Sequence, residues 1–504
     1  MNKISILIAS VVLLAVGYFV GQSGEVAPTV IKVASEPKAE FTSSGTEELA
    51  KSSAGVVRSL KTPSNGEVVI VNNGESIQEA VAAAEPGTTI KVMPGTYKET
   101  VYIDKDNITL SGVIERGEYP VLEGEGLRND AVLYSGNGVT IENFYITHYK
   151  GNAIMGQAGN NFIIRNNIVV DTGVYGIFPQ LGKNGIVSHN VLSGIEDAAI
   201  YVGMSDNIDV VFNEVFDSVA GIEIENSRHA LVEANYVHDN TGGILAFITP
   251  GLPIKTCGDV LIRNNFIVNN NTENFAIPGS LVSNIPRGTG VLVMACDDVV
   301  VEGNIITGNE SLGITFTDFA LAGNAARDPD SDPYPNRPVI LNNLMYDNGK
   351  NPSPIVRAAL ATELMTRGPD IADTVGMEDG CIQNPERFRT IGLDKYGDCS
   401  ISTTANVASY TLPEPVPPRT MEDLDKGRLA YYGVCAGCHA YGSRMIGPPT
   451  QILQALYMDD PEGIAAYAAN PVKKRDDYPE MPPQSHLDEE TRLAAAKFML
   501  KVKN

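Results

Sequence analysis

The chain has 504 residues, more than one compact hydrophobic core normally organises, so several domains are expected. Its 61 acidic residues outnumber its 37 basic residues and give a formal net charge of −24. Nucleic-acid binding and adsorption to anionic lipid both need a basic face, so this balance argues against both classes of partner.

Residues 1–24 are typical of an export signal, because Lys3 precedes an apolar run over residues 4–20. The run is long for a cleaved signal but short for a membrane-spanning helix, which needs roughly 20 residues. A cleaved signal peptide and an uncleaved signal anchor therefore both stay open. Either one predicts a periplasmic or other extracytoplasmic protein, and an uncleaved signal would anchor it in the inner membrane. Residues 25–65 have the composition of a flexible tether.

A short helix is expected near the start of the ordered region. Ser76 and Glu79 form a capping-box pair, and Ile77, Val81 and Ala84 share one helical face.

An apolar-flanked asparagine then recurs along the chain, at first every 22 to 24 residues. Its members are Asn143, Asn167, Asn190, Asn213, Asn235, Asn265, Asn304 and Asn343. A parallel column contains Ile154, Ile177, Ile200, Ile222, Ile244, Val291 and Ile314. A repeat of this length with strand periodicity predicts one coil of a β-helix, in which inward apolar residues stack and inward asparagines form a ladder.

Residues 66–350 resemble the pectate-lyase-like right-handed parallel β-helix superfamily. The stretch IQEAVAAAEPGTTIKVMPGTYKETVYI resembles its capping helix and first strands, while DAAIYVG, GIEIENS and TGGILAF resemble an uncharacterised group of exported bacterial β-helix proteins. The resemblance implies a mainly β fold with about 22–23 residues per coil. It implies no activity, because this scaffold hosts lyases, hydrolases, epimerases and binding proteins.

Four cysteines are expected to form two disulfides. TCGDVLIRNNF and ACDDVVVEGNI match position for position, which places Cys257 beside Cys296 on stacked coils, within the Cα separation of about 4.4–6.8 Å that a disulfide needs. Cys381 and Cys399 are the remaining pair and are expected to pin an irregular cap over residues 351–410. Disulfides fit an oxidising compartment.

Residues 420–504 contain the string CAGCH, preceded by a stiff proline linker over residues 411–419 that is expected to isolate this domain. Cys435 and Cys438 are spaced to form thioethers with haem vinyl groups, and His439 follows where it can ligate iron. A redox dithiol would need a βαβ context and a zinc site would need two further ligands near by. Neither pattern is present, so one covalent haem c is predicted.

The second axial ligand is predicted to be Met481, which lies in EMPP just before the expected last helix. A thioether opposite an imidazole raises the reduction potential and closes the iron to substrates. Met445, Met458 and His486 are the rival ligands.

Residues 420–504 resemble small class I cytochromes c over nearly all of their length. In that family, a proline after the attachment motif accepts a hydrogen bond from the proximal imidazole, and Pro448 in IGPP matches it. Such a bond fixes the ring and raises its basicity. The resemblance implies a small all-α domain that transfers one electron at a time to or from a redox partner protein.

Two carboxylates, Glu223 and Glu225, are predicted to lie with Tyr201 on one exposed sheet face of the β-helix, with Asp197 or His229 as a third member. That set could bind a polysaccharide, with the carboxylates as acid and base, or hold Ca²⁺. The alternative is a solvated sheet face without a ligand.

Insertions at FITPGLPIK, residues 272–288 and DPDSDPYP interrupt the repeat, and long loops on a regular scaffold often carry function. The Asp328, Asp330 and Asp332 spacing hints weakly at Ca²⁺. Three functions stay open: an electron carrier whose β-helix positions a partner, a carbohydrate-active enzyme with an accessory haem, and a structural β-helix that docks on a surface polymer.

Overall fold

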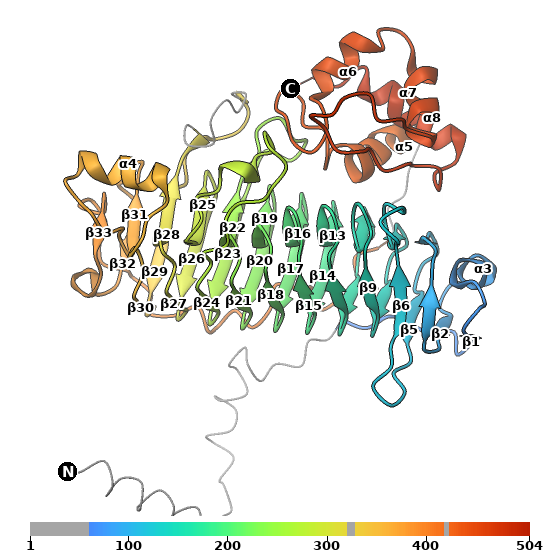
Figure 1. Ribbon diagram of the computed structural model, residues 1–504, viewed down its shortest axis with the longest axis horizontal. Helices are drawn as coiled ribbons and strands as arrows, with labels where there is room; N and C mark the ends of the chain where they lie inside the picture. Colours follow the sequence, from blue (N-terminus) through green and yellow to red (C-terminus); the bar gives the residue numbers. More distant parts are fainter. Residues whose placement is uncertain (1–59, 320–327, 418–422, 504) are drawn as a thin grey trace, which may run out of the picture. The chain divides into compact units, whose positions relative to one another are not determined.

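A computed structural model describes residues 60–319, 328–417 and 423–503 (Figure 1). The predicted signal, its possible membrane anchor and most of the tether lie outside these residues. Within the described ranges, no helix is long and apolar enough to cross a membrane.

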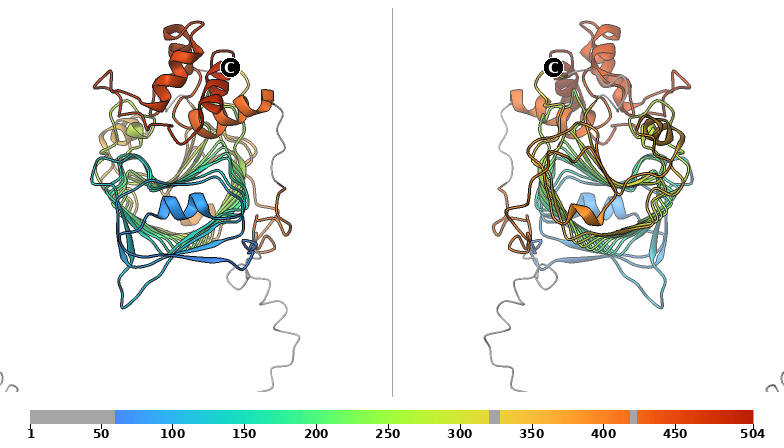
Figure 2. Two further views of the ribbon diagram at one scale, coloured as in Figure 1. Left: turned by 90° about the vertical axis from the view of Figure 1, so that its right-hand side faces the viewer. Right: turned by 90° about the vertical axis from the view of Figure 1, so that its left-hand side faces the viewer.

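Three parallel sheets form a β-helix, and each sheet holds its strands in chain order (Figures 1 and 2). Sheet A contains β1 (Val68–Val71), β2 (Thr89–Val92), β5 (Thr109–Gly112), β8 (Thr140–Glu142), β11 (Ile163–Arg165), β14 (Lys183–Ser188), β17 (Asp206–Val211), β20 (Arg228–Glu233), β23 (Gly258–Arg263), β26 (Asp297–Glu302), β29 (Val339–Leu341) and β32 (Cys381–Ile382). Sheet B contains β3 (Gly95–Tyr97), β6 (Pro120–Glu123), β9 (Tyr145–Thr147), β12 (Ile168–Val170), β15 (Val191–Ser193), β18 (Glu214–Phe216), β21 (Tyr236–His238), β24 (Phe266–Val268), β27 (Ile305–Thr307) and β30 (Leu344–Tyr346). Sheet C contains β4 (Val101–Ile103), β7 (Val132–Tyr134), β10 (Ile154–Gln157), β13 (Tyr175–Gln180), β16 (Ala198–Gly203), β19 (Ala220–Glu225), β22 (Gly242–Phe247), β25 (Thr289–Met294), β28 (Leu312–Thr317), β31 (Ile371–Asp373) and β33 (Thr390–Ile391).

The register of sheet C confirms the predicted apolar column. Each of its residues pairs with the next one, in the order Ile154, Ile177, Ile200, Ile222, Ile244, Val291 and Ile314. All of them are fully buried. Strand side chains alternate between the two faces, so the residue that directly follows each column member along its strand points away from the coil interior.

The asparagine ladder runs from Asn167 to Asn343. At each step one side-chain Nδ2 donates to the Oδ1 of the next asparagine at 3.0–3.1 Å, and that Oδ1 also accepts a backbone N–H. Asn143 is wrongly aligned, because Phe144 takes the equivalent position and donates its N–H to the Oδ1 of Asn167. A second ladder, which the sequence analysis missed, joins Asn240, Asn270, Asn309 and Asn348.

Helix α3 (Ile77–Ala83) closes the N-terminal end of the coil, as predicted. The Ser76 hydroxyl accepts from the Glu79 N–H at 3.1 Å, and Ile77 and Val81 are fully buried. The carboxylate of Glu99 accepts two further N–H groups of the first turn, which compensates orphan helix donors.

Both predicted disulfides are present. Cys257–Cys296 has a Cα–Cα distance of 4.7 Å and Cys381–Cys399 one of 4.9 Å. The cap region over residues 351–410 is more regular than predicted, because α4 (Pro354–Thr362) lies in it and β31, β32 and β33 continue the sheets.

The proline-rich segment does not isolate the last domain, contrary to prediction. Asn161 and Asn184, both with positive φ, bind it through their side chains. The Oδ1 of Asn184 accepts from the Leu412 N–H at 2.8 Å, and Asn161 bonds both the N–H and the carbonyl of Val416. An extended segment leaves its backbone groups free, so a row of asparagine amides can hold it against the β-helix as a strap.

The chain ends in a helical segment. Its elements are α5 (Asp423–Ala430), the π-helical turn η5 (Tyr431–Cys435), α6 (Thr450–Leu456), α7 (Pro461–Ala469) and α8 (Glu489–Met499). Short 3-10 turns elsewhere are η2 (Val282–Asn284) and η4 (Pro385–Arg387).

Replacing Asn235 by alanine should lower the free energy of unfolding by at least about 2 kcal/mol. The change leaves the backbone N–H of Asn213 without its partner and removes one hydrogen bond each from the Asn213 Nδ2 and the Asn265 Oδ1, and an orphaned buried group costs about 1–3 kcal/mol. Denaturant unfolding followed by circular dichroism measures this. Asn72→Ala, at an exposed position, is the matched control. An equal decrease in the free energy of unfolding in both variants would contradict a stabilising role of the ladder.

Candidate functional site

The C-x-x-C-H string starts where the π-helical turn η5 ends. The His439 N–H donates to the Cys435 carbonyl at 3.0 Å and the Cys438 N–H donates to the same oxygen at 3.1 Å, so the string forms one tight turn. Both thiols are free and partly buried. Their turn therefore presents two unoxidised sulfurs and one imidazole together.

The imidazole of His439 has a fixed orientation. Its Nδ1 lies 2.8 Å from the carbonyl oxygen of Pro448, as predicted from IGPP. A carbonyl only accepts, so Nδ1 carries the proton and Nε2 keeps its lone pair. The close approach also requires glycine at 447, where an added Cβ would lie 2.3 Å from the His439 Cε1.

Burial keeps the groups of this turn uncharged. It raises the pKa of both thiols, Cys435 and Cys438, to about 12. It lowers the pKa of His439, against the opposing effect of the hydrogen bond to Pro448. A neutral imidazole with a free Nε2 can act as a ligand at neutral pH.

The four proposed second ligands differ in environment. Met481 is half-buried ahead of α8 and Met445 is buried, whereas Met458 is 73% exposed. His486 donates from Nε2 to the side-chain oxygen of Gln157 at 2.9 Å, and burial lowers its pKa to about 4.

The turn formed by the C-x-x-C-H string lies against sheet C of the β-helix. Gln180 on β13 donates from Nε2 to the Tyr432 carbonyl at 3.1 Å. An added Cβ at Gly437 would lie 2.9 Å from the Phe178 ring, and Cys438 packs against the apolar core of the β-helix.

Three acidic side chains gather beneath this turn: Asp197, Glu223 and Glu225, here called the carboxylate cluster. The predicted pair and the predicted third member Asp197 do come together, but the prediction of an exposed face is wrong. Glu223 and Glu225 are each 1% exposed. Met445 and Ile446 of the helical segment cover them together with residues 280–282 of the insertion over residues 272–288.

Tyrosines complete the walls of the carboxylate cluster. Tyr201 pairs with Glu223 across β16 and β19, and its ring stacks on Tyr175 with centroids 4.5 Å apart. Tyr175, which was not predicted to belong to the site, lines the same cavity as Tyr201.

Several oxygens of the carboxylate cluster lack partners. Thr249 donates its hydroxyl to one oxygen of Glu225. The hydroxyl of Tyr201, one oxygen of Glu223 and the other oxygen of Glu225 have no hydrogen-bond partner among the described residues. The cavity between them is about 20 Å³, enough for one water but not for a sugar ring.

Burial raises the pKa of all three acids of the cluster. It raises the pKa of Asp197 to about 7 and, together with the Asp197 charge, raises that of Glu225 to about 8 against the opposing hydrogen bond from Thr249. Burial and the Asp197 carboxylate also raise the pKa of Glu223 well above its usual range. Glu225 is therefore largely protonated at neutral pH.

His229 does not belong to this site. It lies on β20 of sheet A, where its Nδ1 is 2.8 Å from Asp206. Among the weak calcium candidates, the Asp328 carboxylate is bound by Lys255 and by the Gly251 N–H. No three His, Cys, Asp or Glu side chains of the described ranges are grouped to hold a metal ion, and the calcium hypothesis stays a prediction.

Glu225→Gln should reduce the decrease in the free energy of unfolding that occurs as the pH becomes alkaline. A buried acid with a raised pKa stabilises the fold below its unfolded pKa of about 4.5, and this contribution disappears as pH rises through about 8, roughly 3–5 kcal/mol over the whole window. Unfolding free energies at pH 5 and pH 9 should differ less in the variant. The exposed Glu118→Gln is the control, and parallel pH profiles of all three proteins would contradict burial of a protonated Glu225.

Comparison with known families identifies the β-helix. The model of the family described as periplasmic copper-binding protein (NosD) matches residues 98–284, and the right-handed β-helix region model matches residues 213–359. Each covers less than half of the chain, and together they show a right-handed β-helix domain. No curated protein sequence matches the chain significantly.

Solved structures with a similar fold include enzymes of polysaccharides and oligosaccharides. The A-module of the mannuronan C-5 epimerase AlgE4 of Azotobacter vinelandii is 15% identical, with 60% of this chain and 87% of that chain covered and a TM-score of 0.41. An alginate lyase of Paenibacillus sp. str. FPU-7 is 14% identical (56% and 97% covered, TM-score 0.38), and the DFA-IIIase of Arthrobacter chlorophenolicus A6 is 12% identical (63% and 94%, TM-score 0.41). Similarity this distant concerns the fold and not the activity.

Proposed function

We propose that the protein is an extracytoplasmic c-type cytochrome that transfers single electrons through a haem bound by Cys435, Cys438 and His439. The observation that carries the proposal is the hydrogen bond from the His439 Nδ1 to the Pro448 carbonyl at 2.8 Å, which directs a free Nε2 lone pair away from the backbone. Metal-binding histidines commonly donate one ring N–H to a hydrogen-bond acceptor in this way, which leaves the other ring nitrogen free to bind the metal.

The chain's own groups suit a covalent haem. Cys435 and Cys438 are free in a protein whose other four cysteines form disulfides, and Gly447 leaves room beside the imidazole. When bound, a haem c supplies an iron that cycles between two oxidation states. The polypeptide's part is to hold the imidazole neutral and oriented and to exclude water with apolar side chains.

We propose that Met481 would hold the haem iron together with His439. Its half-buried position ahead of α8 would suit a thioether ligand, whereas Met458 is turned to solvent and His486 is hydrogen-bonded to Gln157. Two disulfides and the periplasmic description of the matching family favour an extracytoplasmic location, where a redox partner protein would exchange electrons with the haem.

Expression in a host that matures c-type cytochromes should give a protein with a Soret band and the mass of one haem above the polypeptide. Cys435→Ser with Cys438→Ser should lose both signals, whereas Cys381→Ser with Cys399→Ser should keep them. Met481→Leu should keep the mass but lose the Met–iron charge-transfer band. Wild-type protein with the bare polypeptide mass would refute the cytochrome.

A second candidate function is acid–base chemistry on a carbohydrate by Glu223, Glu225 and Tyr201. It is favoured by the unpartnered oxygens and by burial, which raises the pKa of both glutamates, since a carboxyl that keeps its proton can act as an acid. A sugar would need the helical segment to move away from sheet C, because Met445 and Ile446 cover these groups.

Reducing-sugar release and binding on a glycan panel test this candidate. If the β-helix acts on a glycan, the full chain should turn it over or bind it, and Glu223→Gln should abolish turnover without weakening haem absorbance. Neither binding nor turnover in the wild type would remove the second function and leave the cytochrome unaffected.

A further inference from the structure

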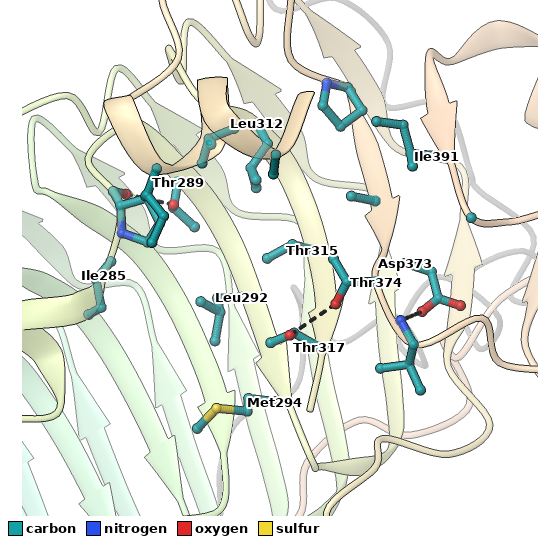
Figure 3. Close-up of a pocket in the computed structure, with 18 of the residues that line it drawn as sticks. Ile285, Thr289, Leu292, Met294, Leu312, Thr315, Thr317, Asp373, Thr374 and Ile391 are labelled. Carbon is teal, nitrogen blue, oxygen red and sulfur yellow. Dashed lines mark hydrogen bonds between the residues drawn. The ribbon is translucent and has the colours of Figure 1, made fainter. Parts of the chain in front are cut away.

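A large cleft opens on sheet C beside the carboxylate cluster, with a volume of about 670 Å³ (Figure 3). Its floor is the outward face of β22, β25 and β28, where Leu245, Leu292 and Thr315 pair in register. Helix α4 contributes one wall and the insertion around η2 contributes another. Binding sites for small molecules commonly have volumes of about 300–1,000 Å³.

The lining of this cleft contains no cationic side chain. Its residues include no lysine, arginine or histidine, so nothing there can pair with a uronate, a phosphate or a fatty-acid carboxylate. Two exposed acids, Glu363 and Asp394, add negative charge at the cleft. The cleft therefore repels anions, which sets it apart from a groove for an acidic polysaccharide.

Apart from Thr315, Glu363 and Asp394, the polar side chains that line the cleft already make hydrogen bonds within the protein. The Asp373 carboxylate accepts from the backbone N–H groups of Val375, Gly376 and Met377 at 2.8–2.9 Å. The Thr374 hydroxyl donates to Thr317, as Figure 3 shows. A ligand with many hydroxyl groups would find few partners, and burying unpaired polar groups is costly.

Thr315 is the exception on the floor. No hydrogen bond joins its hydroxyl to another of the described residues, although it lies between Leu292 and Ala372 in the register of sheet C. An unpaired hydroxyl on an otherwise apolar floor can donate one hydrogen bond to a ligand, and such isolated polar groups orient ligands in apolar sites.

We propose that this cleft binds an uncharged, mostly hydrocarbon small molecule that carries a single carbonyl or hydroxyl group, which Thr315 hydrogen-bonds. Leu245, Leu292 and Met294 form the apolar floor, and Ile355 of α4, 59% exposed, is covered by the ligand. The charge of the cleft selects against anions and its scarcity of free polar groups selects against sugars.

The cleft is separate from the proposed haem attachment turn but borders the carboxylate cluster. Phe247 and residues 281 and 282 line both the cleft and the small cavity over the cluster. No haem ligand lines the cleft, so ligand binding there does not depend on the cytochrome proposal.

Fluorescence of N-phenyl-1-naphthylamine, an uncharged probe that brightens in apolar sites, tests the proposal on the full mature chain. The wild type should bind it with saturation, and Leu292→Arg should weaken binding at least tenfold, because a guanidinium then occupies the floor. Leu344→Arg, the same change at an exposed position on β30, is the matched control and should leave binding unchanged.

Competition with 2-acetylnaphthalene, an aromatic ketone, tests the hydroxyl. Thr315→Val should weaken binding of the ketone by about 2- to 10-fold, which corresponds to the loss of one hydrogen bond. The affinity of the probe should stay unchanged. An unchanged ketone affinity would overturn the role of Thr315.

Three results would overturn the site itself. They are an absence of saturable probe binding, equal binding by Leu292→Arg, and displacement of the probe by oligomannuronate. A wild-type dimer that Leu292→Arg converts to a monomer would instead assign the cleft to a second copy of the chain.

Discussion

In-register hydrogen bonding between successive coils is the constraint on which the rest of the structure depends. Each strand of sheet C pairs in parallel with its equivalent one coil later, so the repeat length decides which side chains meet. An inward asparagine then meets another asparagine, and both amides are satisfied by one repeated geometry. The ladder step from Asn265 to Asn304 spans 39 residues and is as regular as the shorter steps, so insertions leave the stack intact.

The same constraint decides where variation can occur. A coil cannot change its pairing without breaking the ladder, so extra residues must leave at the bends and return to the same register. The insertion around η2, helix α4 and the C-terminal helical segment all end on the outward face of sheet C. This face is thereby divided into a covered part that contains the carboxylate cluster and an open apolar cleft. Phe247 belongs to both parts.

What could be predicted from the sequence follows from this periodicity. The apolar column, the Cys257–Cys296 disulfide and the shared face of Tyr201, Glu223 and Glu225 all depend on counting residues within a repeat. Asn143 was misplaced by one residue, because an asparagine next to the true position mimics the pattern. The Pro448 hydrogen bond was predicted through a local motif.

Contacts between distant segments could not be predicted in this way. Proline-rich composition indicates an extended segment but not whether something binds its free backbone groups, and the row of asparagines on sheet A does so here. Alternation identifies an outward face, but Met445 and Ile446, which form part of the cover over Glu223, lie more than 200 positions later in the chain. Such a contact leaves no periodic signal in either segment.

The burial and the protonation of the carboxylate cluster depend on each other. Four of the side chains that cover it, Met445, Ile446 and those of residues 281 and 282, are apolar, and the hydroxyl of Ser280 makes no hydrogen bond to any of the described residues. Ionised acids beneath such a cover would lose their hydration without compensation, which is why desolvation is the main cause of the raised pKa values. Proton binding by these buried acids is therefore linked to the stability of the folded state, which falls as alkaline pH removes the protons.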